Sequence, residues 1–273
     1  MLWNAKNGEV VLGDTEMSYA SFGRGERVLI LLPGLSDGLA TVRGKALVLA
    51  WPYRRFLNRY TIYMFSRKNR MPEGYSIRDM ADDQARAMEA LGIRRAAVMG
   101  VSQGGMIAQY LAIDHAEMVD KLVLAVSAPY ANDTVRGCVS RWMDLAGSGQ
   151  FKALFIDIQE RSYSEAYLRK YRALYPVMGA VMKRLPLDRF FINARAILAF
   201  NALDLLRQIS CPVLLIGGTD DGIVGANAIR EMKERLANSE LHVYEGLGHG
   251  AYEEAADFND RVFAFLEAEP SRG

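Results

Sequence analysis

Short apolar runs alternate with longer amphipathic stretches along most of the 273-residue chain. Short runs that are rich in β-branched residues predict buried strands, whereas apolar positions repeated every three or four residues predict helices. This alternation is typical of an α/β fold, in which helices cover both faces of a mostly parallel sheet. The pattern predicts eight strands, over Glu9–Leu12, Met17–Phe22, Val28–Leu32, Thr61–Phe65, Ala96–Val101, Leu122–Val126, Val213–Ile216 and Leu241–Tyr244.

Local signals refine several of these elements. A turn with Gly13 and Asp14 separates the first two strands and predicts an antiparallel pair. Ser76 and Asp79 form a capping-box pattern at the start of a helix that ends at Gly92. Further helices are predicted over Met106–Ile113, over Ala226–Leu236, and along the C-terminal apolar stripe of Phe258, Val262, Phe265 and Leu266.

The alternation of strands and helices fails in one long segment. Residues 131–207 contain no convincing strand, and their many Met and aromatic residues lie at helical spacing. Such a segment predicts a helical insertion outside the sheet. The predicted organisation is therefore an α/β core formed by residues 1–130 and 208–273, interrupted by a helical insertion of residues 131–207.

The sharpest chemical signal is the segment Gly100-Val101-Ser102-Gln103-Gly104-Gly105, which lies between a predicted strand and a predicted helix. A serine in such a sharp strand-to-helix turn requires small residues two positions before and after it, and Gly100 and Gly104 occupy these positions. The segment matches a G-x-S-x-G nucleophile elbow. The turn exposes the Ser102 hydroxyl, and the N–H of Gln103 points toward developing negative charge.

A nucleophilic serine requires a base, and the chain offers only three histidines. His115 ends a predicted helix, where a polar residue suits the helix C-terminus, and His242 alternates within a predicted strand. His249 lies in a glycine-rich loop between the last strand and the last helix, where it is free to reach a neighbouring strand end. We therefore expect His249 to be the base.

The orienting carboxylate is expected beyond the end of another strand, between the serine and the histidine in chain order. The strand over Val213–Ile216 leads to two adjacent acids, Asp220 and Asp221. Neighbouring residues of an extended segment point in opposite directions, so only one of the two should face His249. Spacing alone does not choose between them.

These three segments, in this order, resemble the α/β-hydrolase superfamily over nearly the whole chain. The triad acid of that family usually begins a D-x-[IV]-[VT] run, here Asp221 to Val224, so the resemblance favours Asp221. It also implies an eight-stranded sheet with an antiparallel second strand, and a helical cap inserted after the sixth strand. Finally, it implies that the backbone N–H groups of Leu35 and Gln103 form the oxyanion hole, although Pro33 stands where relatives have a histidine.

The loop after the fourth strand departs from the family pattern. Relatives often have an Arg-x-Gly-x-Gly-x-Ser sequence there, whereas this chain has Ser66-Arg67-Lys68-Asn69-Arg70, without the glycines. We expect this departure to place bulky basic residues near the site entrance. Such a cluster either recognises an anionic substituent of the substrate or forms a solvated loop.

Composition excludes several other classes of function. The 33 Lys and Arg residues nearly balance the 32 Asp and Glu residues, so no basic field favours nucleic acid as a partner. The two cysteines, Cys138 and Cys211, form no CxxC motif and indicate neither a disulfide framework nor a zinc site. With no signal-peptide pattern and no long apolar stretch, we expect a cytoplasmic protein that does not associate with membranes.

The predicted function is a carboxylesterase-like serine hydrolase that cleaves a small or medium acyl ester with Ser102, Asp221 and His249, without a metal or other cofactor. Alternatives on the same fold are an aminopeptidase, a lactonase, a C–C hydrolase or a cofactor-free perhydrolase, and a ligand-binding protein is a further class. The expected partner is a small acyl substrate, and the expected assembly is a monomer or homodimer. Candidate substrate contacts are Gly34, Trp142, Tyr167 and Tyr171, although aromatic residues in the insertion also suit packing against the sheet.

Overall fold

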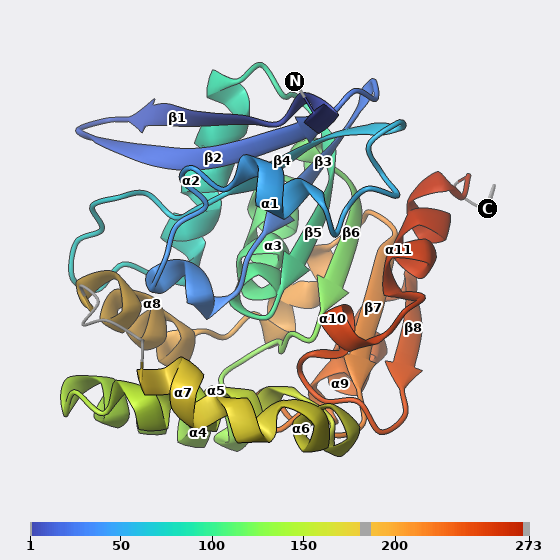
Figure 1. Cartoon of the computed structure of the whole chain (residues 1–273). Coiled ribbons are helices and arrows are strands. Elements are labelled where there is room, and N and C mark those ends of the chain that lie inside the picture. Colours follow the sequence, from blue (N-terminus) through green and yellow to red (C-terminus); the bar gives the residue numbers. More distant parts are fainter. Residues whose placement is uncertain (1, 181–186, 270–273) are drawn as a thin grey trace.

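The computed structural model describes residues 2–180 and 187–269, which form an eight-stranded sheet with helices on both faces (Figure 1). The strands follow the order β1-β2-β4-β3-β5-β6-β7-β8, and only β2 is antiparallel to its neighbours. The predicted fold class, with its antiparallel second strand, is thereby confirmed. The strands are β1 (Lys6–Leu12), β2 (Thr15–Gly23), β3 (Arg27–Leu32), β4 (Tyr60–Phe65), β5 (Ala96–Val101), β6 (Val119–Ala125), β7 (Val213–Gly218) and β8 (Ser239–Tyr244).

The sixth strand differs most from its predicted range. It begins at Val119 and ends at Ala125, so the prediction that it includes Val126 is wrong. Val126 has a φ of 45°, in the left-handed region that a β-branched residue rarely adopts, so the extended conformation cannot continue through it. The apolar side chain of Val126 is buried beyond the strand end, which is why its hydrophobicity resembled that of a strand residue.

Two hydrophobic clusters fill the two faces of the sheet. One lies beneath α2, α3 and α9, and the other beneath α1 and α11. No helix in the described ranges combines the length and the apolar character needed to cross a membrane. The α-helices are α1 (Ala46–Ala50), α2 (Ile77–Ala90), α3 (Gln103–Asp114), α4 (Asp133–Gly147), α5 (Phe151–Ser162), α6 (Glu165–Tyr171), α7 (Tyr175–Ala180), α8 (Asp188–Ala199), α9 (Ala228–Arg235), α10 (Ala251–Glu254) and α11 (Phe258–Glu267).

The predicted start and end of α2 are both present. The Asp79 N–H donates to Ser76 Oγ at 3.1 Å, and the Ser76 N–H donates to Asp79 Oδ2 at 2.8 Å. This reciprocal pair satisfies backbone donors that have no partner within the helix. Gly92, with a φ of 71°, turns the chain out of the helix after Leu91.

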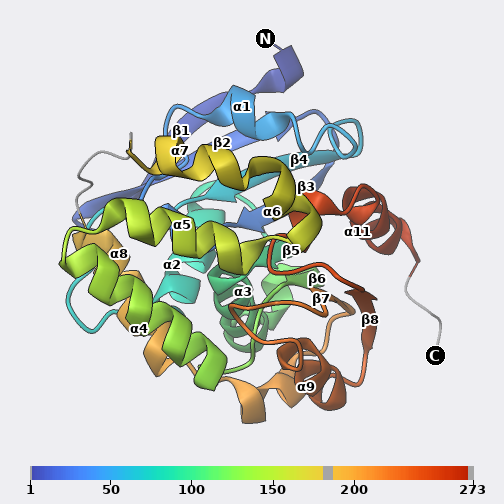
Figure 2. The same cartoon turned by 60° about the horizontal axis from the view of Figure 1, so that its bottom comes forward.

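Helices α4 to α8 come between β6 and β7 and form a layer that we call the helical block. Figure 1 shows this layer below the sheet, and Figure 2 shows it in front of the carboxyl ends of the parallel strands. The predicted helical insertion after the sixth strand is therefore present. Because the connections of parallel strands place functional loops at their carboxyl ends, the helical block covers the edge where a site is expected.

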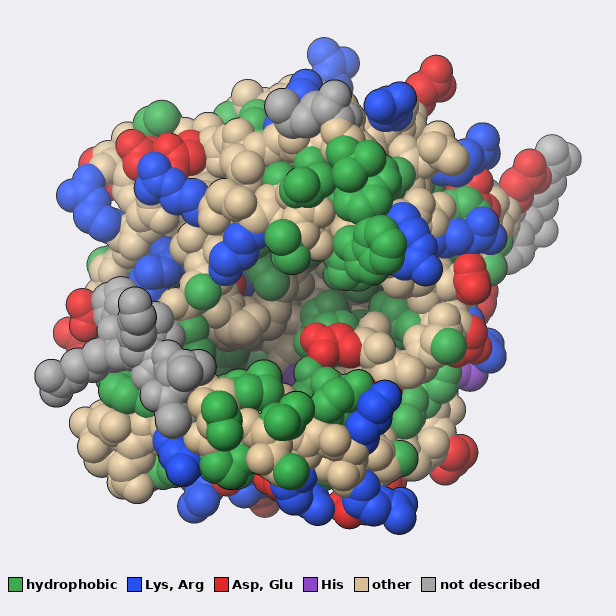
Figure 3. Space-filling model, in the orientation of Figure 1, with side chains coloured by type: hydrophobic (Ala, Val, Ile, Leu, Met, Phe, Trp, Pro, Cys, Tyr) green, Lys and Arg blue, Asp and Glu red, His purple; other side chains and the backbone are tan. Residues whose placement is uncertain are grey.

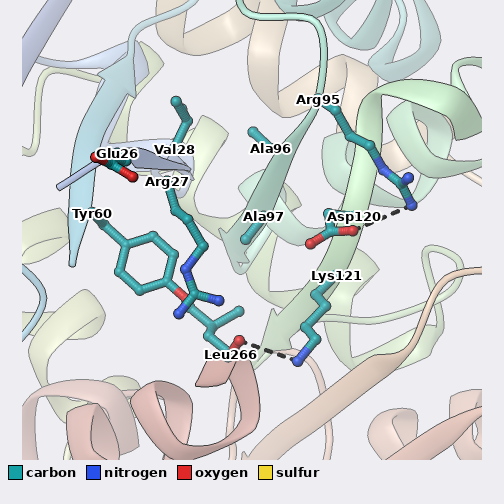
Figure 4. A pocket seen from close by; sticks show the side chains of 10 residues that line it. All are labelled: Glu26, Arg27, Val28, Tyr60, Arg95, Ala96, Ala97, Asp120, Lys121 and Leu266. Carbon is teal, nitrogen blue, oxygen red and sulfur yellow. Dashed lines mark hydrogen bonds and ion pairs between the residues drawn. The ribbon is translucent and has the colours of Figure 1, made fainter. Parts of the chain in front are cut away.

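Polar contacts also lie at the opposite edge of the sheet. A cavity of about 340 Å³ lies there, at the amino ends of β3, β5 and β6 (Figure 4). Lys121 Nζ donates to the carbonyl oxygens of Phe265, Leu266 and Ala268, which end α11, and Arg95 pairs with Asp120 at 3.2 Å. Lys121 therefore completes the end of α11 and serves the packing of this helix against the sheet, whereas the Arg95–Asp120 pair is exposed.

Helix α3 packs very closely against β3. A Cβ atom at Gly104 would lie 1.9 Å from the carbonyl oxygen of Leu32, which belongs to the backbone of β3 and cannot turn away. Only glycine therefore allows α3 to pack at this depth. By contrast, a Cβ at Gly137, in α4, would meet nothing within 4 Å.

We predict that Gly104→Ala lowers the free energy of unfolding by about 3 kcal/mol, because the backbone of α3 must move away from β3. For a chain of this size that loss lowers Tm by roughly 6–12 °C. Gly137→Ala is the control, and it should raise stability by about 0.5–1 kcal/mol because alanine favours a helix interior. Thermal unfolding followed by circular dichroism checks both values, and equal Tm changes in the two variants would contradict this interpretation.

Candidate active site

Ser102 has the backbone conformation of a nucleophile elbow. It lies between β5 and α3 with φ 56° and ψ −120°, a combination that is strained for a residue with a side chain. Hydrogen bonds hold its backbone there: its N–H donates to the carbonyl of Ala125 at 2.9 Å, and its own carbonyl accepts from Ser127 Oγ and from the Gly105 N–H at 2.9 Å each. The strain is therefore sustained by the neighbouring strand β6 and by the start of α3.

The glycines of the elbow are required by their surroundings. A Cβ at Gly100 would lie 2.3 Å from the carbonyl oxygen of Gly104, and a Cβ at Gly105 would lie 2.5 Å from Ser127 Oγ. Gly100 and Gly104 therefore face each other across the turn, as the sequence predicts. Gly105, which the G-x-S-x-G pattern does not include, makes room for the side chain that binds the Ser102 carbonyl.

His249 and Asp221 meet in the same region. His249 Nδ1 lies 2.8 Å from Asp221 Oδ2, and both side chains are almost fully buried. The other carboxylate oxygen, Oδ1, accepts the N–H groups of Ile223 and Val224 at 2.9 Å each. Two backbone donors and the imidazole thus fix the Asp221 carboxylate in one orientation.

The adjacent acid has a different role. Asp220 is exposed, and its Oδ1 accepts a hydrogen bond from Thr219 Oγ1 at 2.9 Å. The choice that spacing leaves open is therefore decided by geometry, because only Asp221 contacts His249. The D-x-I-V run, Asp221 to Val224, has a structural role through its backbone. The N–H groups of its third and fourth residues, Ile223 and Val224, donate to the carboxylate of Asp221.

The other two histidines lie elsewhere. His115 Nε2 is 2.8 Å from Asp82 Oδ1, and His242 packs edge-on against Tyr244 in β8. Neither lines the cavity that contains Ser102, whereas His249 does. The structure thus brings together the serine, the histidine and the acid that the sequence selects.

Ser102 and His249 line one cavity of about 140 Å³ at the carboxyl edge of the sheet. Two of the candidate substrate contacts, Gly34 and Trp142, also line it. The other two do not: Tyr167 stacks between Tyr163 and Tyr171 along α6, with ring centroids 4.1 and 4.5 Å away. The remaining lining residues in the described part of the chain are Leu35, Ser36, Leu39, Val101, Ile158, Ser162, Phe190, Ile223 and Tyr252.

Two helix starts face the nucleophile. Gln103 is the first residue of α3, and Leu35 is the first residue of the 3-10 turn Leu35–Gly38. The first N–H groups of a helix have no acceptor inside it and carry its partial positive charge. The loop lies close to the serine, since a Cβ at Gly34 would be 3.3 Å from Ser102 Cβ.

The prediction for the basic loop after β4 is wrong for Arg67. This residue is only 2% exposed and lies behind the Leu35 loop rather than at the site entrance. Arg67 Nη2 donates to the Pro33 carbonyl at 2.7 Å and to Gln103 Oε1 at 2.9 Å. Burial lowers the pKa of Arg67 to about 10, which leaves the guanidinium charged at neutral pH.

The other two basic residues of that loop also differ from the prediction of an anion-recognition cluster. Lys68 Nζ lies 3.5 Å from Asp83 Oδ1 and above the ring of Tyr75. Arg70 is exposed beside Asp14. Each side chain is thus engaged away from the Ser102 cavity, and neither lines it.

Helix α8 joins this buried polar cluster. Gln103 Nε2 donates to Asn193 Oδ1 at 2.9 Å, and Arg189 Nη2 donates to Asp37 Oδ2 at 3.0 Å, which also accepts the Arg67 N–H at 2.8 Å. The sequence does not predict these contacts of α8. The one available signal is the four-residue spacing of Arg189 and Asn193, which places both on one helix face.

The helical block also contacts the histidine loop. The Ser162 carbonyl, at the end of α5, accepts the Gly250 N–H. The N–H of Ser164 donates to Glu254 Oε1 at 3.0 Å. The loop that carries His249 is therefore held from one side by Asp221 and from the other by the corner between α5 and α6.

Neither a reactive thiolate nor a metal cluster is found in the described ranges. Burial raises the pKa of the Cys138 thiol to about 12 and that of Cys211 to about 11, so neither forms a thiolate near neutral pH. The described residues contain no group of three or more His, Cys, Asp or Glu side chains that could hold a metal ion.

The chain is similar to known hydrolases. A relative from Caulobacter segnis, named "Putative carbamate hydrolase RutD", is 28% identical over 250 residues, covering 89% of this chain and 92% of its own. A Pseudomonas protein named 2-hydroxy-6-oxononadienedioate/2-hydroxy-6-oxononatrienedioate hydrolase is 31% identical over 195 residues, covering 66% and 65%.

Among solved structures, the fold is similar to that of MGS-M2, an alpha/beta hydrolase enzyme from a deep-sea metagenome library of the Medee basin. The TM-score is 0.84 and the identity 19%, with 96% of this chain and 98% of that chain covered. A family model described as the alpha/beta hydrolase fold matches residues 63–256, a span that includes the elbow, Asp221 and His249. Because this match extends over well more than half of the sequence, the chain belongs to the alpha/beta hydrolase family.

Proposed function

We propose that this protein is a serine hydrolase that cleaves a carboxylic ester through an acyl-enzyme. The observation that carries the proposal is the contact of His249 with Asp221 at 2.8 Å, because His249 lines the same cavity as the strained Ser102. Since Nδ1 of His249 is engaged by Asp221, its Nε2 is left to accept a proton from the serine hydroxyl. Membership in a hydrolase family supports the same reaction class.

In the proposed mechanism, His249 takes the Ser102 proton as Oγ attacks the acyl carbonyl, and Asp221 stabilises the imidazolium. The N–H groups of Gln103 and Leu35 bind the oxyanion of the tetrahedral intermediate, and the loss of one such donor typically costs roughly 3–4 kcal/mol. His249 then protonates the departing alcohol. Water, activated by the same imidazole, hydrolyses the acyl-enzyme, while the helical block serves as a cap over the substrate.

C–C bond hydrolysis is the second candidate, favoured by the Pseudomonas relative. An ester requires less of the site, because its alkoxide leaving group needs only the proton from His249, whereas a carbanion must also be stabilised. The cavity around Ser102 is lined mostly by apolar side chains, and its described residues include no Lys or Arg that could stabilise a carbanion. This lining favours the ester.

We predict that a fluorophosphonate labels the wild-type protein at Ser102 and that chromogenic acyl esters are hydrolysed. Ser102→Ala should lose labelling completely and lose kcat by at least about 10⁴-fold. Mass spectrometry of the labelled protein and a panel of esters, amides and lactones provide the measurements. Absence of labelling in a folded sample would overturn the proposal, and turnover of amides without esters would identify a peptidase instead.

We predict that Asp221→Asn lowers kcat by roughly 10³–10⁴-fold, because the amide stabilises the wrong imidazole tautomer. Asp220→Asn is the matched control one residue away and should retain wild-type kcat, since Asp220 does not contact His249. Likewise, His249→Ala should abolish turnover while His115→Ala and His242→Ala retain it. Steady-state kinetics on folded variants would contradict the assignment if the paired variants lost equal activity.

We predict that Arg67→Met lowers kcat by roughly 10- to 100-fold with little change in KM, because the Pro33 carbonyl and Gln103 lose the donor that positions them. Arg70→Met removes an equal charge from the exposed part of the same loop and should leave both constants unchanged. Steady-state kinetics below the melting temperature of each variant test the positioning role. A folded Arg67→Met enzyme with wild-type kcat would show that Arg67 serves stability alone.

A further inference from the structure

A second cavity continues from the Ser102 cavity. It measures about 160 Å³ and shares four lining residues with the Ser102 cavity: Gly34, Ser36, Val101 and Tyr252. A third cavity, of about 560 Å³, continues from the second and shares Leu49, Tyr53, Met64, Met99 and Tyr252 with it. Because Tyr252 borders all three, the cavities lie next to one another in a row from Ser102 to α1, and we call the second and third cavities together the side passage.

We propose that this side passage binds the acyl chain of the substrate, and that the preferred ester carries a linear aliphatic acyl group of medium to long chain. The inference rests on the proposed ester hydrolysis and names its substrate class. The cavity around Ser102 is by itself smaller than the roughly 300–1,000 Å³ typical of ligand sites, so a larger acyl group must extend beyond it.

The walls of the side passage suit an aliphatic chain. Leu49, Met64 and Met99 supply apolar surface, and the unbranched thioethers adapt to a flexible ligand. The remaining polar groups of its inner part include the phenols of Tyr53 and Tyr252, which stay uncharged because burial raises their pKa values. Among the described lining residues, the charged ones are Arg54 and Glu253, which border the third cavity but not the second.

The position of His249 assigns the side passage to the acyl group rather than to the alcohol. The departing alcohol must lie within reach of the imidazole that protonates it. His249 lines the Ser102 cavity but neither of the other two in the described residues. The side passage instead leaves Ser102 on the side of Gly34, next to the loop that would hold the oxyanion. An acyl chain that points this way leaves the space beside His249 for the alcohol.

The far end of the side passage opens beside an exposed apolar surface. Val48 and Trp51 are 76% and 59% exposed, and Trp51 also lines the third cavity. Figure 3 shows hydrophobic side chains gathered over α1 beside a hollow in this face. An exposed group of large apolar side chains is typical of a binding surface. Here it provides apolar contact for a chain that reaches the end of the side passage.

The kinetic test compares two substitutions within α1. Leu49 lines the side passage, whereas Leu47 points outward, so Leu49→Trp should block the side passage and Leu47→Trp should not. With p-nitrophenyl acetate, butyrate, octanoate and decanoate, wild-type kcat/KM should rise by about tenfold or more from acetate to octanoate. Leu49→Trp should abolish that rise and keep acetate turnover, while Leu47→Trp keeps the wild-type profile.

A structure of the wild-type protein inactivated by an octyl fluorophosphonate gives a test that needs no variant. The octyl chain on phosphorus takes the position of the acyl chain, and we expect it between Leu49 and Met99. A chain that lies instead against α4 and α5 would overturn the proposal, as would an unchanged chain-length profile in folded Leu49→Trp. If neither labelling nor ester turnover occurs, the proposed ester hydrolysis fails as well, whereas turnover of acetate alone rejects only the acyl-chain passage.

Discussion

The site depends on how closely α3 packs against the sheet. The carbonyl of Leu32 occupies the space that a side chain at position 104 would need, and Gly100 faces Gly104 across the turn. Since the helix starts so close to the strands, the chain can pass from β5 to α3 only through a left-handed residue, and that residue is Ser102. The strained backbone of Ser102 is thus a consequence of core packing. The hydrophobic contacts between α3 and the sheet oppose any shift of the helix that would relax this strain.

A second layer of control lies behind the nucleophile, in buried polar contacts. Arg67 connects the Pro33 carbonyl with the Gln103 side chain, and Gln103 in turn binds Asn193 of the helical block. A buried guanidinium is unfavourable unless its donors are satisfied, so these acceptors must keep their places for the fold to persist. The backbone N–H groups proposed to bind the oxyanion are carried by the same two segments, and their positions are therefore fixed from behind.

The sequence predicts the sheet, Ser102 and His249 because all of them follow from local patterns. Strands alternate with helices, the elbow needs its glycines, and His249 lies in a glycine-rich loop. The choice between Asp220 and Asp221 needs more, because it depends on which carboxylate receives the N–H groups of Ile223 and Val224. The prediction of an exposed Arg67 fails because a basic residue in a loop is ordinarily solvated. The acceptors that bind its buried guanidinium, Pro33 and Gln103, lie 34 and 36 positions away in the sequence. The aromatic side chains of Tyr167 and Tyr171 would suit the wall of a pocket, but in the structure their two rings pack against each other along α6.

The polar contacts of α8 have a consequence for how such a protein can diversify. Asn193 and Arg189 reach into the core to bind Gln103 and Asp37, and the corner of α5 and α6 holds the loop of His249. The helical block is therefore not an interchangeable module. A helical block without these two residues would leave the Gln103 amide nitrogen and the Asp37 carboxylate without the partners that α8 supplies, so a change of specificity is least costly when side chains are replaced within the existing helices.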